Sequence, residues 1–281
     1  MPSAVAVAAF GIAVLPYASP DRLSLTSPNT NPTEVVLVYI LSVMMLSVVF
    51  AYASFPLYRF LEGYTMPAPL RHWLLRRRYR EWYKVRGPLE RYLDGDDSQD
   101  FDPEAAQRYP ADREDLLPTK LGSTLRAMER YGYHTFGLDV LTFWNELRGV
   151  AHDNLRRDGE DARAGVDFFI SAIAHLALLA IASATVAAAS RSVVPGLVAL
   201  VALGLMPLAY GQAVRNVDDW RAATQALVHL SRVPLANSLG LRMPRTFAEE
   251  REMWEAFMGV VQYGPGPDGF TLRQLDRRRI R

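Results

Sequence analysis

Three long uncharged stretches dominate the pattern of hydrophobic and polar positions along the chain. They cover residues 35–58, 168–190 and 192–214, and they contain 24, 23 and 23 residues. A helix needs about 20 apolar residues to cross the roughly 30 Å hydrocarbon core of a bilayer. At 1.5 Å per residue, each stretch would extend about 35 Å as a helix. One such stretch could be a buried helix of a soluble protein, but three together predict three transmembrane helices.

The first residues form a shorter apolar stretch that allows more than one interpretation. Residues 1–20 carry no charge, and their apolar core covers residues 4–17. A signal peptide would begin with a basic segment, which is missing here. We interpret residues 4–17 as a short or clipped first membrane segment. A re-entrant or surface-lying segment is one alternative, and a start codon placed too far downstream is another.

The positive charges are strongly segregated along the sequence. Of 31 Lys and Arg residues, 18 lie in residues 59–166 and 11 in residues 215–281. The other two are Arg22, which precedes the uncharged stretch 35–58, and Arg191, which lies between the stretches 168–190 and 192–214. Loops rich in Lys and Arg stay on the cytoplasmic side of a membrane, so both long regions, including the C-terminus, are predicted to be cytoplasmic.

The segregation divides the chain into four parts. They are an N-terminal membrane hairpin (1–58), a cytoplasmic region with a basic helix, an acidic linker and a helical domain (59–166), a transmembrane hairpin (167–214), and cytoplasmic C-terminal helices with a basic tail (215–281). The predicted fold is an all-α integral membrane protein with two transmembrane helix pairs, in which the first span is uncertain.

Several local signals predict where the cytoplasmic helices begin and end. Thr119 is placed to cap a helix that the glycines of residues 130–137 should break, and a second helix should cover residues 139–147. The helix that follows residue 215 should end at Pro234, because proline interrupts the helical hydrogen bonds. Thr246 and Glu249 have the spacing of a capping box. Almost no residues alternate as in a strand.

A basic, aromatic stretch follows the second apolar segment. It reads RHWLLRRRYREWYKVR (71–86) and contains one acid, Glu81. Each Lys or Arg near an anionic leaflet contributes about 1 kcal/mol, and Trp and Tyr favour the interface. We therefore expect the helix to bind anionic lipid of the cytoplasmic leaflet. The predicted lipid-surface residues are Arg71, Trp73, Arg76, Arg77, Arg78, Arg80, Trp82, Lys84 and Arg86.

Two alternatives for this helix are a docking surface for a protein and a solvated charged helix without a ligand. Nucleic acid is not expected, because the net charge of the chain is only +1. The chain contains no cysteine, which excludes disulfides, thiolate metal sites and cysteine nucleophiles.

One group of polar residues is a candidate for proton transfer or metal binding. Glu129, His134 and Asp139 could meet across the predicted helical break. A structural polar cluster that holds the two helices together is the favoured interpretation. The sequence contains no complete metal-ligand motif, phosphate-binding loop or nucleophile elbow, so no metal and no cofactor are expected.

Three short motifs resemble those of a group of uncharacterised bacterial multi-pass membrane proteins. They are PLYRFLEGYT (56–65), PTKLGSTLRAME (118–129) followed by RYGYHTFGLDVLTFWNEL, and LGLRMPRTFAEEREMW (239–254). Ser123, His134 and Thr65 depart from the usual Asn, Asp and aromatic residue of that group. The resemblance implies two membrane pairs around a cytoplasmic domain in the bacterial inner membrane. It implies no activity.

These observations favour a non-enzymatic, membrane-anchored docking or sensing protein with an unidentified protein partner. One alternative is an oligomeric pore or membrane-disrupting effector, in which copies meet through the alanine-rich hairpin of residues 167–214. Another alternative is a membrane-bound enzyme that uses His134 and Asp139.

Overall fold

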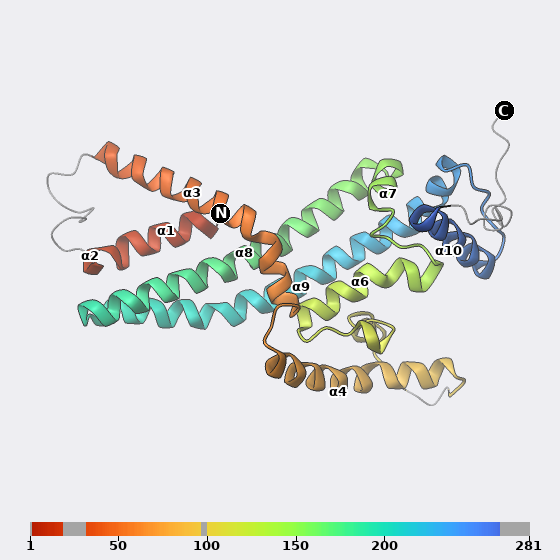
Figure 1. The fold of residues 1–281 in the computed structure, drawn as a ribbon, viewed down its shortest axis with the longest axis horizontal. Coiled ribbons are helices and arrows are strands. Elements are labelled where there is room, and N and C mark those ends of the chain that lie inside the picture. The colour runs from red at the N-terminus through yellow and green to blue at the C-terminus, as the bar shows by residue number, and fades with distance from the viewer. Residues whose placement is uncertain (1, 19–31, 97–99, 265–281) are drawn as a thin grey trace. The chain divides into compact units, whose positions relative to one another are not determined.

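The chain is all-helical in the part that the computed structural model describes, residues 2–18, 32–96 and 100–264 (Figure 1). No strand occurs in these ranges, which confirms the all-α prediction. The helices are α1 (Pro2–Ala13), α2 (Leu15–Ala18), α3 (Pro32–Glu62), α4 (Ala68–Leu93), α5 (Pro103–Gln107), the 3-10 helix η1 (Arg113–Asp115), α6 (Lys120–Phe136), α7 (Trp144–Val150), α8 (Asp153–Ser190), α9 (Val193–Ser238) and α10 (Phe247–Tyr263).

Three of these helices are long and apolar enough to cross a membrane: α3, α8 and α9. Apart from Ser192, they contain the three uncharged stretches, so the prediction of three long apolar helices is confirmed. In the most apolar window of α3, none of the residues is buried against the rest of the chain. This helix therefore owes little of its stability to contacts within the protein.

The helices fall into two compact units. Unit 1 consists of Met1–Leu61 and Ala164–Asn216, and unit 2 consists of Glu62–Arg163 and Val217–Arg281. The helices α3, α8 and α9 each contribute residues to both units.

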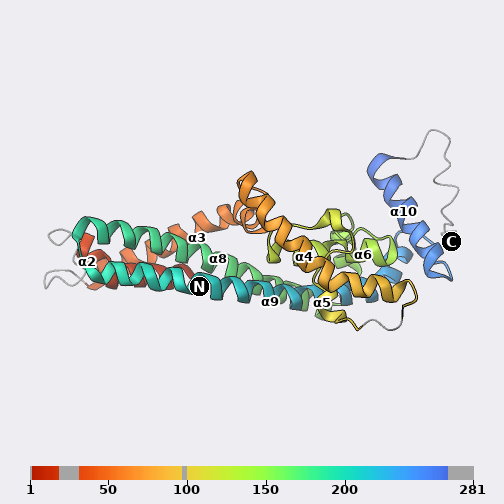
Figure 2. The same cartoon turned by 90° about the horizontal axis from the view of Figure 1, so that it is seen from below.

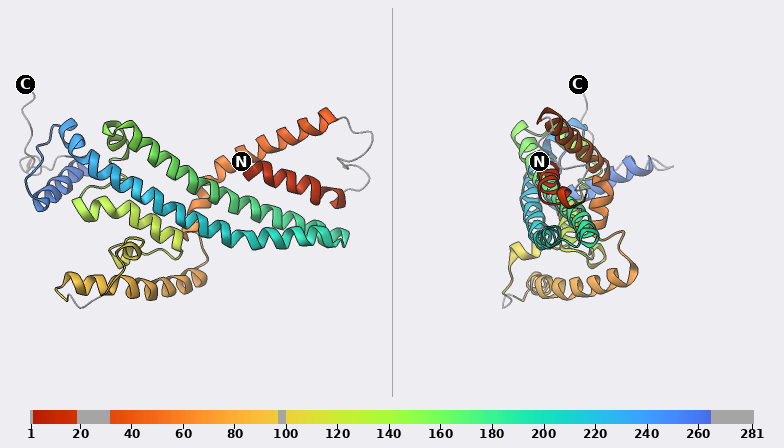
Figure 3. Two further views of the ribbon diagram at one scale, coloured as in Figure 1. Left: turned by 180° about the vertical axis from the view of Figure 1, so that it is seen from behind. Right: turned by 90° about the vertical axis from the view of Figure 1, so that its left-hand side faces the viewer.

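In unit 1, α1 lies between α3 and α8 (Figures 1 and 3). The Ser3 hydroxyl lies 2.8 Å from Nε2 of His175 in α8, and the Tyr39 hydroxyl of α3 donates to the Ala4 carbonyl over 3.0 Å. With 12 residues, α1 extends about 18 Å, which is too short to cross a bilayer by itself. The predicted first pair therefore consists of one long helix and one short helix.

The helices α8 and α9 form the predicted hairpin, which Figure 2 shows as two adjacent helices. Only Arg191 and Ser192 separate them. Arg191 has a φ of 52°, a left-handed conformation that reverses the chain within these two residues. The tight turn that the sequence predicts is thus present.

Unit 2 is built around one hydrophobic core. The core unites residues of α6, the following loop, α7, α9 and α10, and Trp254 of α10 is completely buried in it. The Phe143 ring lies 6.1 Å from the Trp254 ring and 5.7 Å from the Phe257 ring. The loop after α6 therefore packs directly on α10.

The start of α6 agrees with the prediction, but the predicted break within the helix does not occur. Thr119 caps the helix, since its Oγ1 accepts a hydrogen bond from the Gly122 amide over 2.9 Å. Gly132 does not break the helix, which continues to Phe136 and ends at Gly137, whose φ is 75°. Gly132 serves a packing role instead, because the Leu138 carbonyl and the Val140 side chain occupy the space of a Cβ atom.

Two other predicted boundaries are wrong. Asp139 does not begin a helix: its side chain accepts hydrogen bonds from the amides of Leu141 and Thr142, and α7 begins only at Trp144. Side-chain bonds of this kind favour a turn over a helix. Pro234 does not end α9, which continues to Ser238. The full burial of Leu235 and Ala236 in the core offsets the hydrogen bond that proline removes.

Candidate membrane-surface site

The basic stretch of the sequence lies within one helix, α4 in unit 2. This helix begins after Pro67 with a second proline in its first turn, where proline is well tolerated because the first amides have no helical partner. It continues through Pro88 to Leu93. All nine predicted lipid-surface residues are thus on a single helix.

Three of the nine residues face inward and do not form part of a free surface. Arg78 and Trp82 are buried, and Arg86 is partly buried. The Trp82 indole N–H donates to the Pro110 carbonyl over 3.0 Å. Burial lowers the pKa of Arg86, an effect that Glu90 and Asp112 oppose. These three side chains attach α4 to the rest of unit 2.

Glu81, the one acid among the basic residues, is held by several donors. It pairs with Arg77 over 3.3 Å and with Arg78 over 2.5 Å, and it accepts from the Tyr109 hydroxyl over 3.2 Å. Burial and the Glu81 charge raise the pKa of Tyr109. Of the basic residues on the opposite face of the helix, this network includes Arg77.

The opposite face of α4 is exposed and positively charged. Residues 73, 76, 77, 80 and 84 are spaced by three or four positions, which places them on one side of a helix. The Trp73 side chain is 59% exposed, and Leu70 beside it is 45% exposed. We call this surface the outer basic face. It consists of Trp73, Arg76, Arg77, Arg80 and Lys84; Arg71 is exposed too, but it is in line with Arg78 and lies on another side of the helix.

The outer basic face has the chemistry of an anion-binding surface at an apolar boundary. Arg and Lys supply only hydrogen-bond donors and positive charge, and an exposed Trp suits the headgroup layer of a bilayer. The alternation of inward and outward residues could not be resolved from the sequence alone, because basic residues occur on both sides of the helix.

The predicted polar site is divided between different partners. Nε2 of His134 lies 3.6 Å from Oδ2 of Asp112, whereas Asp139 bonds within its own turn. Glu129 pairs with Arg126 over 3.4 Å, and burial raises the pKa of Glu129. The Asp139 charge contributes to this shift, so Asp139 lies near Glu129, whereas His134 pairs with Asp112 instead.

His134 instead joins two acids of the preceding segment. Potential ligand atoms of Asp112, Asp115 and His134 all lie within 4.8 Å of one another. The two carboxylate oxygens of Asp115 each form an ion pair of 3.1 Å, one with Arg126 and one with Arg130. These guanidinium groups already supply the positive charge that a metal ion would add. The cluster therefore has the geometry of an ion-pair network that connects η1 to α6.

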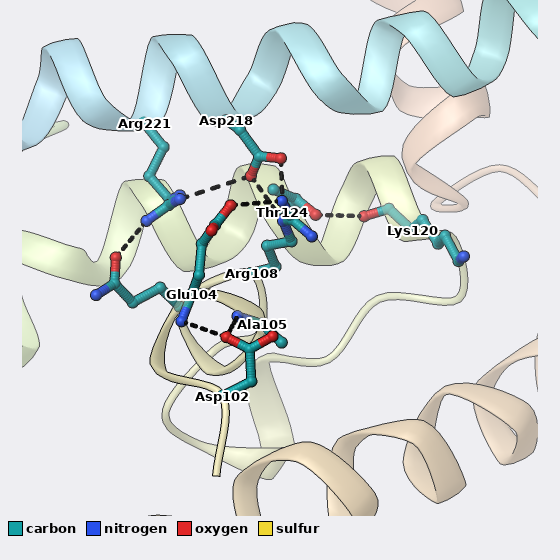
Figure 4. A network of polar contacts seen from close by, with 9 residues as sticks. Asp102, Glu104, Ala105, Arg108, Lys120, Thr124, Asp218 and Arg221 are labelled. Carbon is teal, nitrogen blue, oxygen red and sulfur yellow. Dashed lines mark hydrogen bonds and ion pairs between the residues drawn. The ribbon is translucent and has the colours of Figure 1, made fainter.

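A second polar network, which sequence reasoning missed, attaches α5 to α9 within unit 2 (Figure 4). Asp218 of α9 pairs with Arg108 over 3.0 Å and with Arg221 over 3.7 Å. Buried Arg221 also donates to the Gln107 side chain, and Arg108 reaches Glu104 over 2.8 Å. No sequence signal links these residues, because more than 100 positions separate the two segments.

No family model, curated protein or solved structure matches this chain. The resemblance to bacterial multi-pass membrane proteins therefore stays a prediction based on the three motifs.

Proposed function

We propose that this chain is a bacterial inner-membrane protein with three spans, α3, α8 and α9, which anchor a cytoplasmic helical domain with a lipid-binding surface. The domain docks or senses a protein partner at the membrane and has no enzymatic role. The exposed apolar surface of α3 is the observation that carries this proposal.

The exposure of α3 is hard to reconcile with a water-soluble protein. Met45, Tyr52 and Phe55 are 73%, 85% and 69% exposed, and none of the most apolar window is buried. Leaving one large apolar side chain in water forgoes about 1.5–3 kcal/mol. A bilayer removes this cost along the entire helix, since its hydrocarbon core is as apolar as the side chains.

The distribution of charge supports the orientation. In the sequence, 29 of 31 Lys and Arg side chains lie in the two long regions that flank the spans. The positive-inside rule places those regions in the cytoplasm. With three spans, the α8–α9 turn and the start of α3 lie outside.

The outer basic face of α4 supports the lipid-binding part of the proposal. Among the described residues, Arg77 pairs with Glu81, whereas Arg76, Arg80 and Lys84 on the same face have no ion-pair partner. At about 1 kcal/mol per basic residue near an anionic leaflet, the three free charges of Arg76, Arg80 and Lys84 would bind the helix to the surface. A partner protein with an acidic surface is the competing ligand.

Site-directed spin labelling can test the lipid-binding part, because the chain has no native cysteine. The label is placed at Gly87→Cys, where a Cβ atom meets nothing closer than an Arg91 nitrogen at 3.9 Å. The full chain is reconstituted in phosphatidylcholine nanodiscs with or without phosphatidylglycerol. Anionic lipid should shield the label from a water-soluble relaxation agent.

The variant Arg76→Gln/Arg80→Gln should lose most of this shielding. A matched control is Arg242→Gln/Arg245→Gln, which removes two exposed charges outside α4 and should behave as the unchanged chain does. Equal shielding in all three proteins would refute lipid binding by α4.

In the oligomeric alternative, copies meet through the alanine-rich α8–α9 hairpin, and a second copy could also cover α3. Light scattering of the detergent-solubilised chain distinguishes the two functions. A protein mass of one chain, 31.5 kDa, supports the anchored monomer, whereas a defined multiple supports the pore. The enzyme alternative needs His134 and Asp139 at one site, but His134 lies beside Asp112 and Asp139 bonds within its own turn.

A further inference from the structure

Unit 1 contains an apolar groove in the part of the chain that we place in the bilayer. It has a volume of about 420 Å³ and is lined by residues of α1, α3 and α8. Nine of the eleven lining side chains are Ala, Val, Leu, Met or Phe, and the other two are Ser42 and His175. The volume lies within the range of about 300–1,000 Å³ that is usual for small-molecule sites.

The groove exists because α3 and α8 are held apart by a helix with small side chains. At one end, the Phe50 ring of α3 stacks on the His175 ring of α8 with 3.8 Å between centroids. Past this contact, α1 lies between the two helices (Figures 1 and 3). The side chains that α1 contributes to the groove are Ala6, Val7 and Phe10, and the first two are too small to fill the gap.

The histidine at the groove has partners within the protein. Nδ1 of His175 lies 2.6 Å from the Ser171 carbonyl, which can only accept, so Nδ1 carries the proton. Nε2 then accepts from the Ser3 hydroxyl at 2.8 Å. With both ring nitrogens satisfied, His175 offers no free donor or acceptor to a ligand. The groove thus favours hydrocarbon over a polar substrate.

The groove lies near the centre of the predicted spans. Its residues 42–49 occupy the middle of the uncharged stretch 35–58, and its residues 175–182 occupy the middle of 168–190. Roughly a dozen methylene groups would fill it, if each takes about the 30 Å³ of a liquid water molecule. At this depth in a bilayer, the abundant molecules that fit such a groove are lipid acyl chains. If the groove stayed empty, the side chains that line it would lose dispersion contacts.

We propose that this groove is a binding site for one acyl chain of a membrane phospholipid. The inference rests on the proposed membrane insertion of α3 and α8. Unlike lipids that merely surround α3, the bound chain lies between α1, α3 and α8 and contributes to holding α1 in place.

Photolabelling of the reconstituted chain tests the site. The full-length protein is placed in phosphatidylcholine liposomes that contain phosphatidylcholine with a diazirine near the end of one acyl chain. After illumination, mass spectrometry should find the strongest labelling at groove residues such as Val7, Leu46 and Leu178, several-fold above exposed residues outside the groove such as Val48.

Filling the groove should remove this labelling. Ala182→Trp occupies the site and should reduce labelling of the groove several-fold, whereas Ala184→Trp, at an exposed position outside the groove on the same helix, should leave it unchanged. Leu46→Trp, with Val48→Trp as its control, repeats the test on α3 if the first variant does not fold.

The outcomes separate this inference from the proposed function. A chain that floats with the liposomes but is labelled evenly over its exposed apolar residues, with no effect of Ala182→Trp, would overturn the acyl-chain site and leave membrane insertion intact. A chain that does not float with the liposomes would overturn both.

Discussion

Gly132 decides how closely two segments of unit 2 pack. A Cβ atom at Gly132 would lie 2.5 Å from the Val140 side chain and 2.7 Å from the Leu138 carbonyl. These atoms belong to the loop that enters the core directly after α6. The loop can fold back on α6 only because residue 132 has no side chain.

Gly132→Ala should therefore destabilise the protein by about 1–3 kcal/mol, as overpacking of a core does. Thermal unfolding in detergent measures the effect. Gly149→Ala is the control: a Cβ atom there meets nothing within 4 Å in α7, and alanine should stabilise the helix by about 0.5–1 kcal/mol. Equal stability of the two variants would show that the close approach at Gly132 is unimportant.

His134 should make the stability of unit 2 dependent on pH. Burial lowers the pKa of His134 from its ordinary value of 6.5, and the facing Arg130 and Arg251 act in the same direction, against Asp112 and Asp115. The unfolded chain then binds the proton more readily than the folded chain does. The stabilising contribution of neutral His134 is complete above pH 6.5 and is lost as the pH falls through the folded-state pKa.

His134→Gln should remove this contribution to the pH dependence. Melting temperatures from pH 7.5 down to pH 5 should fall more steeply for the unchanged chain than for the variant. Parallel curves would mean that His134 has an unshifted pKa in the folded protein.

At the scale of elements, α4 has one face that packs and one that is free. Trp82 is 4% exposed and Trp73 is 59% exposed, although both occur in the same basic stretch. We expect Trp82→Ala to cost about 3–5 kcal/mol of stability, the usual loss for a buried aromatic residue.

Trp73→Ala should leave the stability nearly unchanged and weaken binding to anionic lipid. Thermal unfolding and the spin-label accessibility at position 87 measure the two effects separately. If Trp73→Ala destabilised the protein as much as Trp82→Ala, the assignment of the two faces would be wrong.

The sequence predicts the helices of this chain better than their ends. Long uncharged stretches and capping signals act locally, so α3, α8, α9 and the caps at Thr119 and Thr246 could be predicted. The continuation of α9 past Pro234 could not, because it depends on burial of Leu235 by distant residues.

The candidate sites show the same limit. The composition of residues 71–86 predicts a basic helix, but only packing shows that Arg78, Trp82 and Arg86 face inward. The partners of His134 could not be predicted from the sequence either. Asp112 and Asp115 lie about 20 residues before it, and only the path of the chain between η1 and α6 brings them together.

For the whole molecule, insertion of the three long helices is the claim on which the other proposals depend. The lipid-binding face, the acyl-chain groove and the cytoplasmic domain all require α3, α8 and α9 to cross the bilayer. The length and apolar surface of the three helices permit insertion. The exposed apolar side chains of α3 would be unfavourable in water.

Cysteine accessibility in bacterial cells tests this claim most directly, because every introduced cysteine is the only one in the chain. Ser190→Cys lies at the α8–α9 turn, and Gly149→Cys lies in the predicted cytoplasmic domain. Both proteins should sediment with membranes after an alkaline carbonate wash. A membrane-impermeant maleimide added to spheroplasts should label Ser190→Cys at once and Gly149→Cys only after lysis. Recovery of the chain in the carbonate supernatant, or the reverse pattern of labelling, would contradict the account.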